Sequence, residues 1–398
     1  MPCVIFLVSL KYSLTLTCVK KMSNFTSKNI HNNTFSTFFA QMTDPRRTSK
    51  GNHRYPLDEI FFLVISAVIS GCEGWETIHE FGVSKINWLR SYFPYNKGIP
   101  SHDVLNNVFA RLDTKTFNQC FTDWINSISK LTDGEVIAID GKTIRKSNNK
   151  NTAKSAFHMV SAYASENKVC LGQEVVDDKH NEITAIPKLL DLLAIKGCVV
   201  TCDAMGCQTK IAEKIIEKKA DYLLAVKGNQ KELKAQILKT FDQNKPISID
   251  TSVDAGHGRV ETRTCEVIDN LIFFDEKEKW TKLKSIVRIK SERFNKSTEK
   301  TSSETRYYIT SLDADAEKIN TAIRKHWTVE NNLHWTLDVI FKEDESLKKK
   351  DASPVNFNIV RKIALAMIEK ENSIKKSKNV KRLKAALDDK YRTKILNL

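Results

Sequence analysis

The stretch between residues 135 and 241 constrains the fold more than any other part of the chain, because short apolar runs alternate there with amphipathic ones. Short runs rich in β-branched residues predict strands, and apolar residues that recur about every 3.6 positions predict helices. We therefore expect strands at 135–140, 157–164, 168–176, 198–203 and 221–227, and helices at 184–194, 208–218 and 230–241. The succession β-β-β-α-β-α-β-α predicts a mixed α/β fold with helices packed on a sheet.

This order of elements is also that of a ribonuclease-H-like domain. In sheets of this kind, functional groups gather at the carboxyl ends of strands, near a change in strand order. Two of the predicted strands end in an acid, Asp140 after EVIAI and Asp203 after CVVTC. We expect these two strands to be neighbours, so that both carboxylates point into one cleft.

The segments on either side follow other patterns. Apolar periodicity predicts helices at 57–71, 73–91, 101–112 and 114–130, and hence an all-helical N-terminal domain over 37–130. The helices that meet at Leu112 and Asp113 suit a DNA-binding helix-turn-helix or the far commoner packed helix pair. Alternating segments at 247–253, 259–268, 283–290 and 305–311 predict a β-rich insertion over 245–312. The core then comprises 131–244 and 313–370, and a basic helical tail follows at 371–398.

Residues 1–36 are expected to form a poorly ordered extension with no role in the fold. They resemble a signal peptide only weakly, because a positive n-region is absent and Lys11 interrupts the apolar stretch. Met22 and Met42 are alternative starts of translation. No apolar run reaches the roughly 18 residues of a membrane span. Nine scattered cysteines without a CxxC pair favour a reducing compartment and hence a cytoplasmic protein.

The charge balance indicates a polyanionic partner. Lys and Arg number 63 against 48 Asp and Glu, which gives a formal net charge of +15 and a pI near 9.2. Nucleic acid is the usual partner of so basic a chain. The alternative is a basic protein whose charge serves only its solubility.

A third acid stands out in the segment 326–341. Wound as an α-helix, this segment has Glu330 inside its apolar face and His326 and His334 one turn to either side; the face consists of Val329, Leu333, Leu337, Ile340 and Phe341. A carboxylate on such a face needs a cation, a metal or a strong hydrogen-bond partner, because burying a bare charge is costly. A structural ion pair and a metal-binding carboxylate are the two interpretations.

Asp140, Asp203 and Glu330 together favour the metal. We expect the helix that carries Glu330 to pack on the sheet that carries the two aspartates, and converging carboxylates repel one another unless cations neutralise them. Oxygen ligands favour Mg²⁺ or Mn²⁺. Two such ions can activate a water or a DNA 3′-hydroxyl and stabilise the leaving oxygen. Any single acid at a strand end is more often a cap or turn residue, and the H-x3-E-x3-H array of His326, Glu330 and His334 alone would suggest a zinc hydrolase.

Longer motifs carry a resemblance to a known family. They are DPRR at 44–47, the helix at 57–71, IPSHDVLNNVFARLD at 99–113, AIDGKTIR at 138–145, CDAMGCQ at 202–208, LLAVKGNQ at 223–230, HGRVETR at 257–263, HWTVENNLHWTLDVIFKED at 326–344, NFNIVRKIALAMI at 356–368 and KRLKAALDD at 381–389. Over about residues 37–398 the chain resembles the DDE transposases of bacterial insertion sequences, specifically the ISAs family with its H-repeat-associated proteins.

The resemblance implies a ribonuclease-H-like core with a catalytic DDE triad of Asp140, Asp203 and Glu330, which would bind two Mg²⁺ or Mn²⁺ ions. The wider superfamily often has a Tyr-Arg-Glu-Lys signature around the glutamate. This chain departs from it, because His326 stands at the Arg position and Leu337 at the Lys position. The two histidines, His326 and His334, are candidate partners of Glu330.

DNA phosphates are expected to bind basic and polar residues near the triad and on the insertion, since such contacts are independent of base sequence. The candidates are Lys142, Arg145, Lys146, Lys227, Asn229, His257, Arg259 and Arg263. A solvated basic turn is the alternative for the first three. An ion-paired ladder of Arg259, Glu261 and Arg263 on one strand face is an equal alternative for the last two.

The activity that the resemblance implies is DNA transposition. The protein would bind the terminal inverted repeats of its element, cleave the strands by hydrolysis and join 3′-hydroxyl ends to target DNA. It would act as a homo-oligomer on DNA, because two ends must be joined, and it would associate with the bacterial nucleoid. The alternatives are a decayed element whose product only binds DNA and, from the histidine array, a zinc hydrolase.

Overall fold

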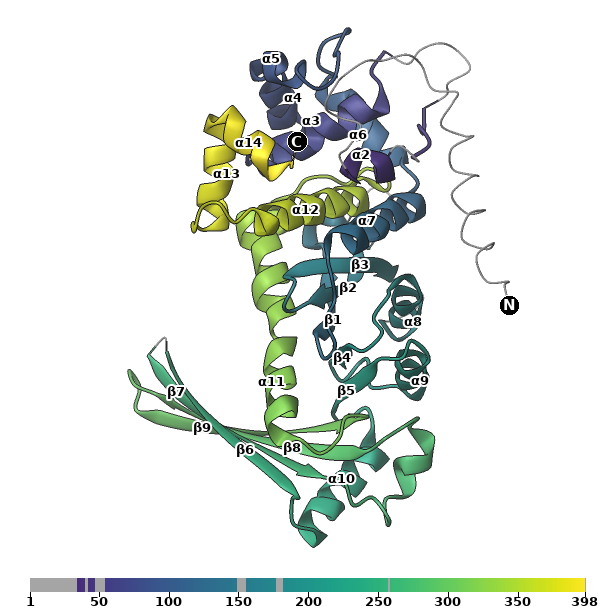
Figure 1. Ribbon diagram of the computed structural model, residues 1–398, viewed down its shortest axis with the longest axis vertical. Coiled ribbons are helices and arrows are strands. Elements are labelled where there is room, and N and C mark those ends of the chain that lie inside the picture. The colour runs from purple at the N-terminus through teal and green to yellow at the C-terminus, as the bar shows by residue number, and fades with distance from the viewer. Residues whose placement is uncertain are drawn as a thin grey trace, which may run out of the picture.

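The computed structural model describes residues 34–39, 42–46, 54–148, 155–176, 182–256 and 258–397. A sheet of nine strands runs through the molecule in the order β3-β2-β1-β4-β5-β9-β8-β7-β6 (Figure 1). The strands are β1 (Val136–Thr143), β2 (His158–Ala164), β3 (Val169–Val176), β4 (Val199–Cys202), β5 (Asp221–Val226), β6 (Ser248–Gly256), β7 (Arg259–Ile268), β8 (Ser285–Asn295) and β9 (Lys300–Thr310). The predicted mixed α/β class is confirmed. Nearly all of the predicted extension, and His257, lie outside the described residues.

β1 organises the first half of the sheet. It pairs antiparallel with β2 and parallel with β4, and β4 pairs parallel with β5. Ile139 of β1 lies beside Cys202 of β4, so Asp140 and Asp203, which follow them, lie at the same level of neighbouring strands. The expected adjacency of the two strands is thus confirmed. The helices α8 (Glu182–Leu192) and α9 (Thr209–Glu217) cover one face of these strands, and α11 (Ala316–His326) covers the other.

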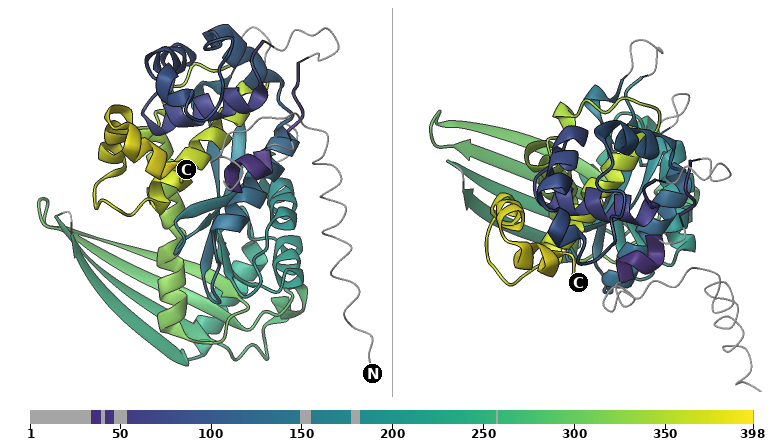
Figure 2. Two further views of the ribbon diagram at one scale, coloured as in Figure 1. Left: turned by 45° about the horizontal axis from the view of Figure 1, so that its top comes forward. Right: turned by 90° about the horizontal axis from the view of Figure 1, so that it is seen from above.

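The predicted β-rich insertion continues this same sheet. β9 pairs antiparallel with β5, and β8, β7 and β6 follow outward in antiparallel order. The four strands form an arm that reaches away from the rest of the molecule (Figure 2), and α10 (Lys231–Gln243) leads into it. The pairing of β5 with β9 brings together segments far apart in the sequence, so strand propensity alone does not predict it.

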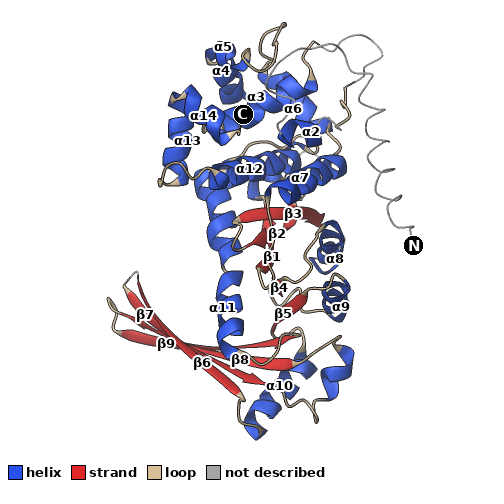
Figure 3. Ribbon diagram, viewed as in Figure 1, coloured by secondary structure: helices blue, strands red, loops and turns tan. Residues whose placement is uncertain are grey.

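Helices gather at the opposite end, beyond β3 (Figure 3). They are α2 (Thr34–Phe39), α3 (Leu57–Ile69), α4 (Trp75–Ser84), α5 (Ile86–Leu89), α6 (His102–Arg111), α7 (Thr114–Ile128), α12 (Ser353–Lys370), α13 (Lys378–Leu387) and α14 (Asp389–Ile395). α12 packs against α3, α6, α7 and β3, and nearly all of its side chains are buried. It therefore joins helices from both ends of the chain to the sheet. Within the described ranges, no helix has the length and apolar character to cross a membrane.

The C-terminal helices, which the sequence marks as a basic tail, use their charges inside the fold. Arg382 of α13 donates to the backbone oxygen of Val68 at 2.9 Å and to the Glu73 carboxylate at 2.5 Å. Arg361 of α12 donates to the same carboxylate at 3.0 Å. The Arg392 side chain of α14 is fully buried and lies 3.9 Å from the Trp88 ring centroid. Part of the net positive charge is therefore neutralised internally.

Strand β1 extends further than predicted. It continues three residues past Asp140, because its end pairs with β2 as far as Thr143 beside His158. The prediction that Asp140 ends its strand is therefore wrong. Asp203, in contrast, directly follows its strand as expected.

The segment predicted as an α-helix over 326–341 is largely π-helical, with π turns at Val329–His334 and Thr336–Ile340. The Trp335 N–H, for example, donates to the backbone oxygen of Glu330, five residues back instead of four. A wider turn changes which residues share a face.

The wider turns place Glu330 outside the apolar face. Val329, Leu333, Leu337 and Phe341, spaced by four, are all buried. Glu330 is exposed to the adjoining pocket. The expectation of a carboxylate within the buried stripe is therefore wrong, since it assumed α-helical geometry.

Lys348 lies in the connection before α12 and is almost completely buried. Its ammonium donates to the backbone oxygen of Glu73 and lies 3.8 Å from the ring centroid of Phe357. Burial lowers the pKa of Lys348 from 10.5 to about 7; the charge of Arg361 lowers it further and that of Glu73 opposes the change.

We expect Lys348→Met to stabilise the fold relative to the native chain most strongly at low pH. The pKa of Lys348 is lower in the folded than in the unfolded chain, so the cost of burying its charge is fully present below pH 7 and declines as the pH rises toward 10.5. Urea unfolding of both proteins at about pH 6 and about pH 9 measures the difference. Lys349→Met, at an exposed neighbour, is the control. A stability difference that does not change with pH would contradict this assignment.

Candidate active site

A pocket of about 290 Å³ lies where β4 and β5 end and α11 passes into the π turns. Asp140, Asp203 and Glu330 all line it. The carboxyl end of β4 supplies Asp203, the body of β1 supplies Asp140, and the first π turn supplies Glu330. The structure thus brings together the three acids singled out in the sequence.

Asp140 contacts the π-helical segment that follows α11. Its Oδ2 lies 3.4 Å from Nδ1 of His334. Burial acts to raise the pKa of Asp140, but the contact with His334 and the nearby charge of His326 outweigh it and hold that pKa below its usual value. The histidines therefore favour the ionised carboxylate that a cation would bind.

Asp203 is fixed by the turn that follows β4. Its Oδ1 accepts hydrogen bonds from the backbone N–H of Met205 at 3.0 Å and of Gly206 at 3.3 Å. A Cβ at Gly206 would come within 2.6 Å of the Cβ of Cys202, so the close turn suits glycine. Burial raises the pKa of Asp203, and the charges of Glu182 and Asp140 add to the effect.

Glu330 lines the same pocket as these acids and comes from the first π turn. Burial raises its pKa, and the negative charge of Asp140 raises it further, while His334 and Arg306 oppose both. Arg306 comes from β9, also lines the pocket, and lies 5.1 Å from the Trp327 ring centroid. Like-charge repulsion within the pocket is therefore only partly relieved by the protein itself.

The two histidines serve the aspartates more than the glutamate. His326 Nδ1 lies 2.9 Å from the hydroxyl of Thr201 on β4 and its ring lines the pocket. Burial lowers the pKa of His326. His334 contacts Asp140 through Nδ1, and its buried Nε2 has no hydrogen-bond partner among the residues that the structure describes. The rings thus contact β1 and β4, and the charge of His334 also acts to lower the pKa of Glu330.

The donor set suits a divalent cation in its chemistry. Asp140, Asp203 and Glu330 offer hard oxygen ligands. Burial raises the pKa values of Asp203 and Glu330, and neighbouring negative charges, which a cation would offset, raise them further. As placed, no three Asp, Glu, His or Cys side chains of the described residues are close enough to ligate one ion together. A bound ion would therefore have to draw the carboxylates inward.

Comparison with known proteins identifies the family. The family model "Transposase DDE domain" matches residues 131–367, and the model "DDE_Tnp_1-associated" matches residues 36–125. The chain belongs to the DDE transposases. Among its relatives are "Putative transposase YncI" of Escherichia coli O157:H7 and "H repeat-associated putative transposase YhhI" of Escherichia coli strain K12, which place it with the H-repeat type.

Both relatives align over almost their whole length. The first is 41% identical over 90% of this chain and 93% of its own. The second is 40% identical over 89% of this chain and 95% of its own. A solved piggyBac transposase synaptic complex with hairpin DNA aligns with a TM-score of 0.44 and 11% identity over 92% of this chain and 77% of that one.

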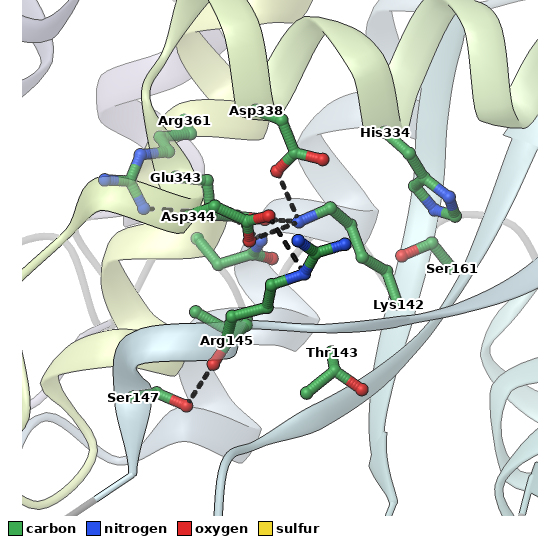
Figure 4. A network of polar contacts seen from close by, with 12 residues as sticks. Lys142, Thr143, Arg145, Ser147, Ser161, His334, Asp338, Glu343, Asp344 and Arg361 are labelled. Atoms are coloured by element: carbon green, nitrogen blue, oxygen red, sulfur yellow. Dashed lines mark hydrogen bonds and ion pairs between the residues drawn. The ribbon is translucent and has the colours of Figure 1, made fainter.

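In this DDE transposase, Lys142 is not available to a phosphate. Its ammonium lies 2.7 Å from the carboxylates of Asp338 and Glu343 and 3.6 Å from that of Asp344 (Figure 4). Burial opposes the charge, but these carboxylates outweigh it and raise the pKa of Lys142. Glu343 is completely buried and also lies 3.6 Å from Arg361. The cluster ties β1, which carries Asp140, to the end of the π segment and to α12.

The other DNA-contact candidates divide by exposure. Arg145, Lys146, Lys227 and Arg259 are exposed and free to meet a phosphate backbone, although Arg145 also pairs with Asp344 at 3.3 Å. Arg263 is buried and lies 3.4 Å from Glu261, which favours the structural ladder for that residue.

Asn229 has a structural contact as well. Its amide donates to the backbone oxygen of Ala204 at 2.6 Å, in the turn that begins with Asp203. The loop after β5 therefore supports the turn that presents one of the three acids.

Sequence reasoning missed several residues of the site. Arg306 and Lys234 line the pocket. The charge of Glu182 helps to raise the pKa of Asp203, and Oε1 of Glu182 lies 2.6 Å from Nε2 of His158. The residue pattern of β9 does not indicate that Arg306 meets this pocket, because its first seven residues are all polar. The position of Arg306 depends on the pairing of β9 with β5.

We expect Lys142→Met to lower the free energy of unfolding by about 3–5 kcal/mol, because it leaves the buried Glu343 carboxylate without its nearest cation. Chemical denaturation measures the loss. Arg145→Met is the matched control, since its side chain is 79% exposed and its single pair with Asp344 is worth at most about 1 kcal/mol.

Adding Glu343→Gln to Lys142→Met should recover part of the loss, since it removes the unpaired buried charge. If Lys142→Met and Arg145→Met lowered the free energy of unfolding equally, the ion pair of Lys142 with the buried Glu343 would not have this stabilising role.

Proposed function

We propose that this protein is a DNA transposase that binds the terminal inverted repeats of its insertion sequence and catalyses metal-dependent strand cleavage and strand transfer. The observation that carries the proposal is the convergence of Asp140, Asp203 and Glu330 on one pocket from two parallel strands and a helix. The strand order β3-β2-β1-β4-β5, with β2 antiparallel to β1, supports a ribonuclease-H-like core.

Asp140, Asp203 and Glu330 would hold Mg²⁺ or Mn²⁺ in a two-metal site. Bound there, such ions supply an activated water or 3′-hydroxyl and stabilise the leaving oxygen. His334 would keep Asp140 ionised and oriented through their 3.4 Å contact. The turn around Met205 and Gly206 would keep Asp203 aimed at the same point.

DNA would approach the pocket along its basic rim. Lys227 and Arg306 line the pocket, and Arg145, Lys146 and Arg259 are exposed beyond it. Their contacts would be to phosphates and therefore independent of base sequence. The helical N-terminal segment is proposed to help recognise the terminal repeats, in a protein that acts as a homo-oligomer at the bacterial nucleoid.

We expect Asp140→Asn, Asp203→Asn and Glu330→Gln each to reduce cleavage of a DNA end that carries the element's terminal repeat by at least about 100-fold, because each removes a ligand of the metal ions that would stabilise the transition state. Cleavage is measured with Mg²⁺ and with Mn²⁺. Asp269→Asn, an exposed acid after β7, should leave the rate unchanged.

DNA binding by the three variants should persist in a gel-shift assay, because their phosphate-contacting residues are intact. Full cleavage by any of the three would remove that residue from the proposed triad. Binding of the repeat by the native chain without cleavage under either metal would favour a decayed, DNA-binding product.

A further inference from the structure

β6 is a free edge of the sheet. It is the last strand in the order, pairs on one side with β7, and forms the outer margin of the arm (Figures 1 and 2). An edge strand carries a row of backbone N–H and C=O groups without a strand partner, which can pair with another strand. The opposite edge, β3, differs because α7, α8 and α12 pack against it.

The two faces of β6 differ in what covers them. α11 packs on one face: the amide of Asn320 donates to Asp250 at 2.7 Å and Arg324 donates to Asp254 at 2.6 Å. No helix of the described residues packs on the opposite face. On it, Ile249 is 60% exposed and Val253 67% exposed, with the exposed Thr251 between them.

β6 also lacks two features by which edge strands often avoid association, an exposed lysine and a proline. It is nine residues long, SIDTSVDAG, without a lysine or a proline. Its register with β7 runs from Ser248 beside Val267 to Gly256 beside Arg259. Its two charges, Asp250 and Asp254, are both engaged by α11. A long edge strand that carries the exposed apolar residues Ile249 and Val253 is a template for strand addition.

We propose that β6 pairs antiparallel with β6 of a second copy of this chain, across a two-fold axis at Thr251, so that the two sheets become continuous. A two-fold contact is self-complementary, because the same residues face one another in exchanged positions. This inference rests on the edge strand itself and does not depend on the proposed activity.

Repulsion between aspartates disfavours the registers centred on either neighbour of Thr251. In that register Asp250 faces Ser252 of the second copy and Asp254 faces Ser248, so no aspartate meets another. Centring the axis on Asp250 would oppose that residue to itself, and centring it on Ser252 would oppose Asp250 to Asp254. Like charges directly opposite one another destabilise a strand pair.

The apolar side chains fit the same register. Ile249 faces Val253 of the second copy, and this contact occurs twice because of the symmetry. Ile247, which is 67% exposed, faces Ala255. Cross-strand apolar pairs of this kind stabilise antiparallel sheets. In a second copy the two-fold symmetry brings Ile249 and Val253 together. A strand of another protein would need apolar residues at the matching positions.

The register is tested by cross-linking the full-length chain in solution. Thr251→Cys should form a covalent dimer on mild oxidation or with a short bis-maleimide, because the two cysteines face each other across the axis. Ile249→Cys alone should not, since its copies would lie about 13 Å apart. A mixture of Ile249→Cys and Val253→Cys should cross-link. The native chain under the same treatment is the control for its own cysteines.

Charge reversal provides the second test. Ile249→Lys with Val253→Lys places lysines opposite lysines and should convert the dimer to a monomer in sedimentation analysis. Ile249→Lys with Val253→Glu places each lysine opposite a glutamate and should restore the dimer. Both positions are exposed, so neither pair of changes disturbs the core. A native chain that is monomeric at micromolar concentration, or a dimer indifferent to the lysine pair, would overturn the proposal.

Discussion

The contact between Lys142 and the buried Glu343 connects the parts of this transposase on which its site depends. Lys142 lies two residues after Asp140 on β1, and Glu343 lies just past the π turns that carry Glu330. Arg361 of α12 joins the same carboxylate. Because a buried charge is tolerable only when paired, these three elements are held together wherever Glu343 stays ionised. The geometry of the pocket is thus fixed partly by an ion pair outside it.

The π turns have a comparable effect within one helix. Apolar residues at a spacing of four remain in register with the core, from Val329 to Phe341. The wider turn simultaneously releases Glu330 toward the pocket and sets His334 beside Asp140. A regular α-helix would put the carboxylate nearer the buried stripe. Local departures of this kind are frequent at functional sites.

Much of the fold was accessible from the sequence because its signals are local. Apolar periodicity predicted the strands and helices of the α/β core to within a few residues, and the acid after each apolar strand drew attention to Asp140 and Asp203. The contacts of Lys142 were not accessible, since a lysine two residues after a candidate acid suggests a phosphate contact. Its partners lie some two hundred positions further along the chain.

The sequence by itself determined the family, the mixed α/β class and the three acids of the candidate site. Motifs, apolar periodicity and residue types are local properties of the sequence. Only the tertiary structure decided that β9 joins β5, that Glu330 leaves the apolar face, that Lys142 is occupied by carboxylates and that β6 is a bare edge. Each of these results from contacts between segments far apart in the chain or from helix geometry that depends on packing. Local propensity does not encode them.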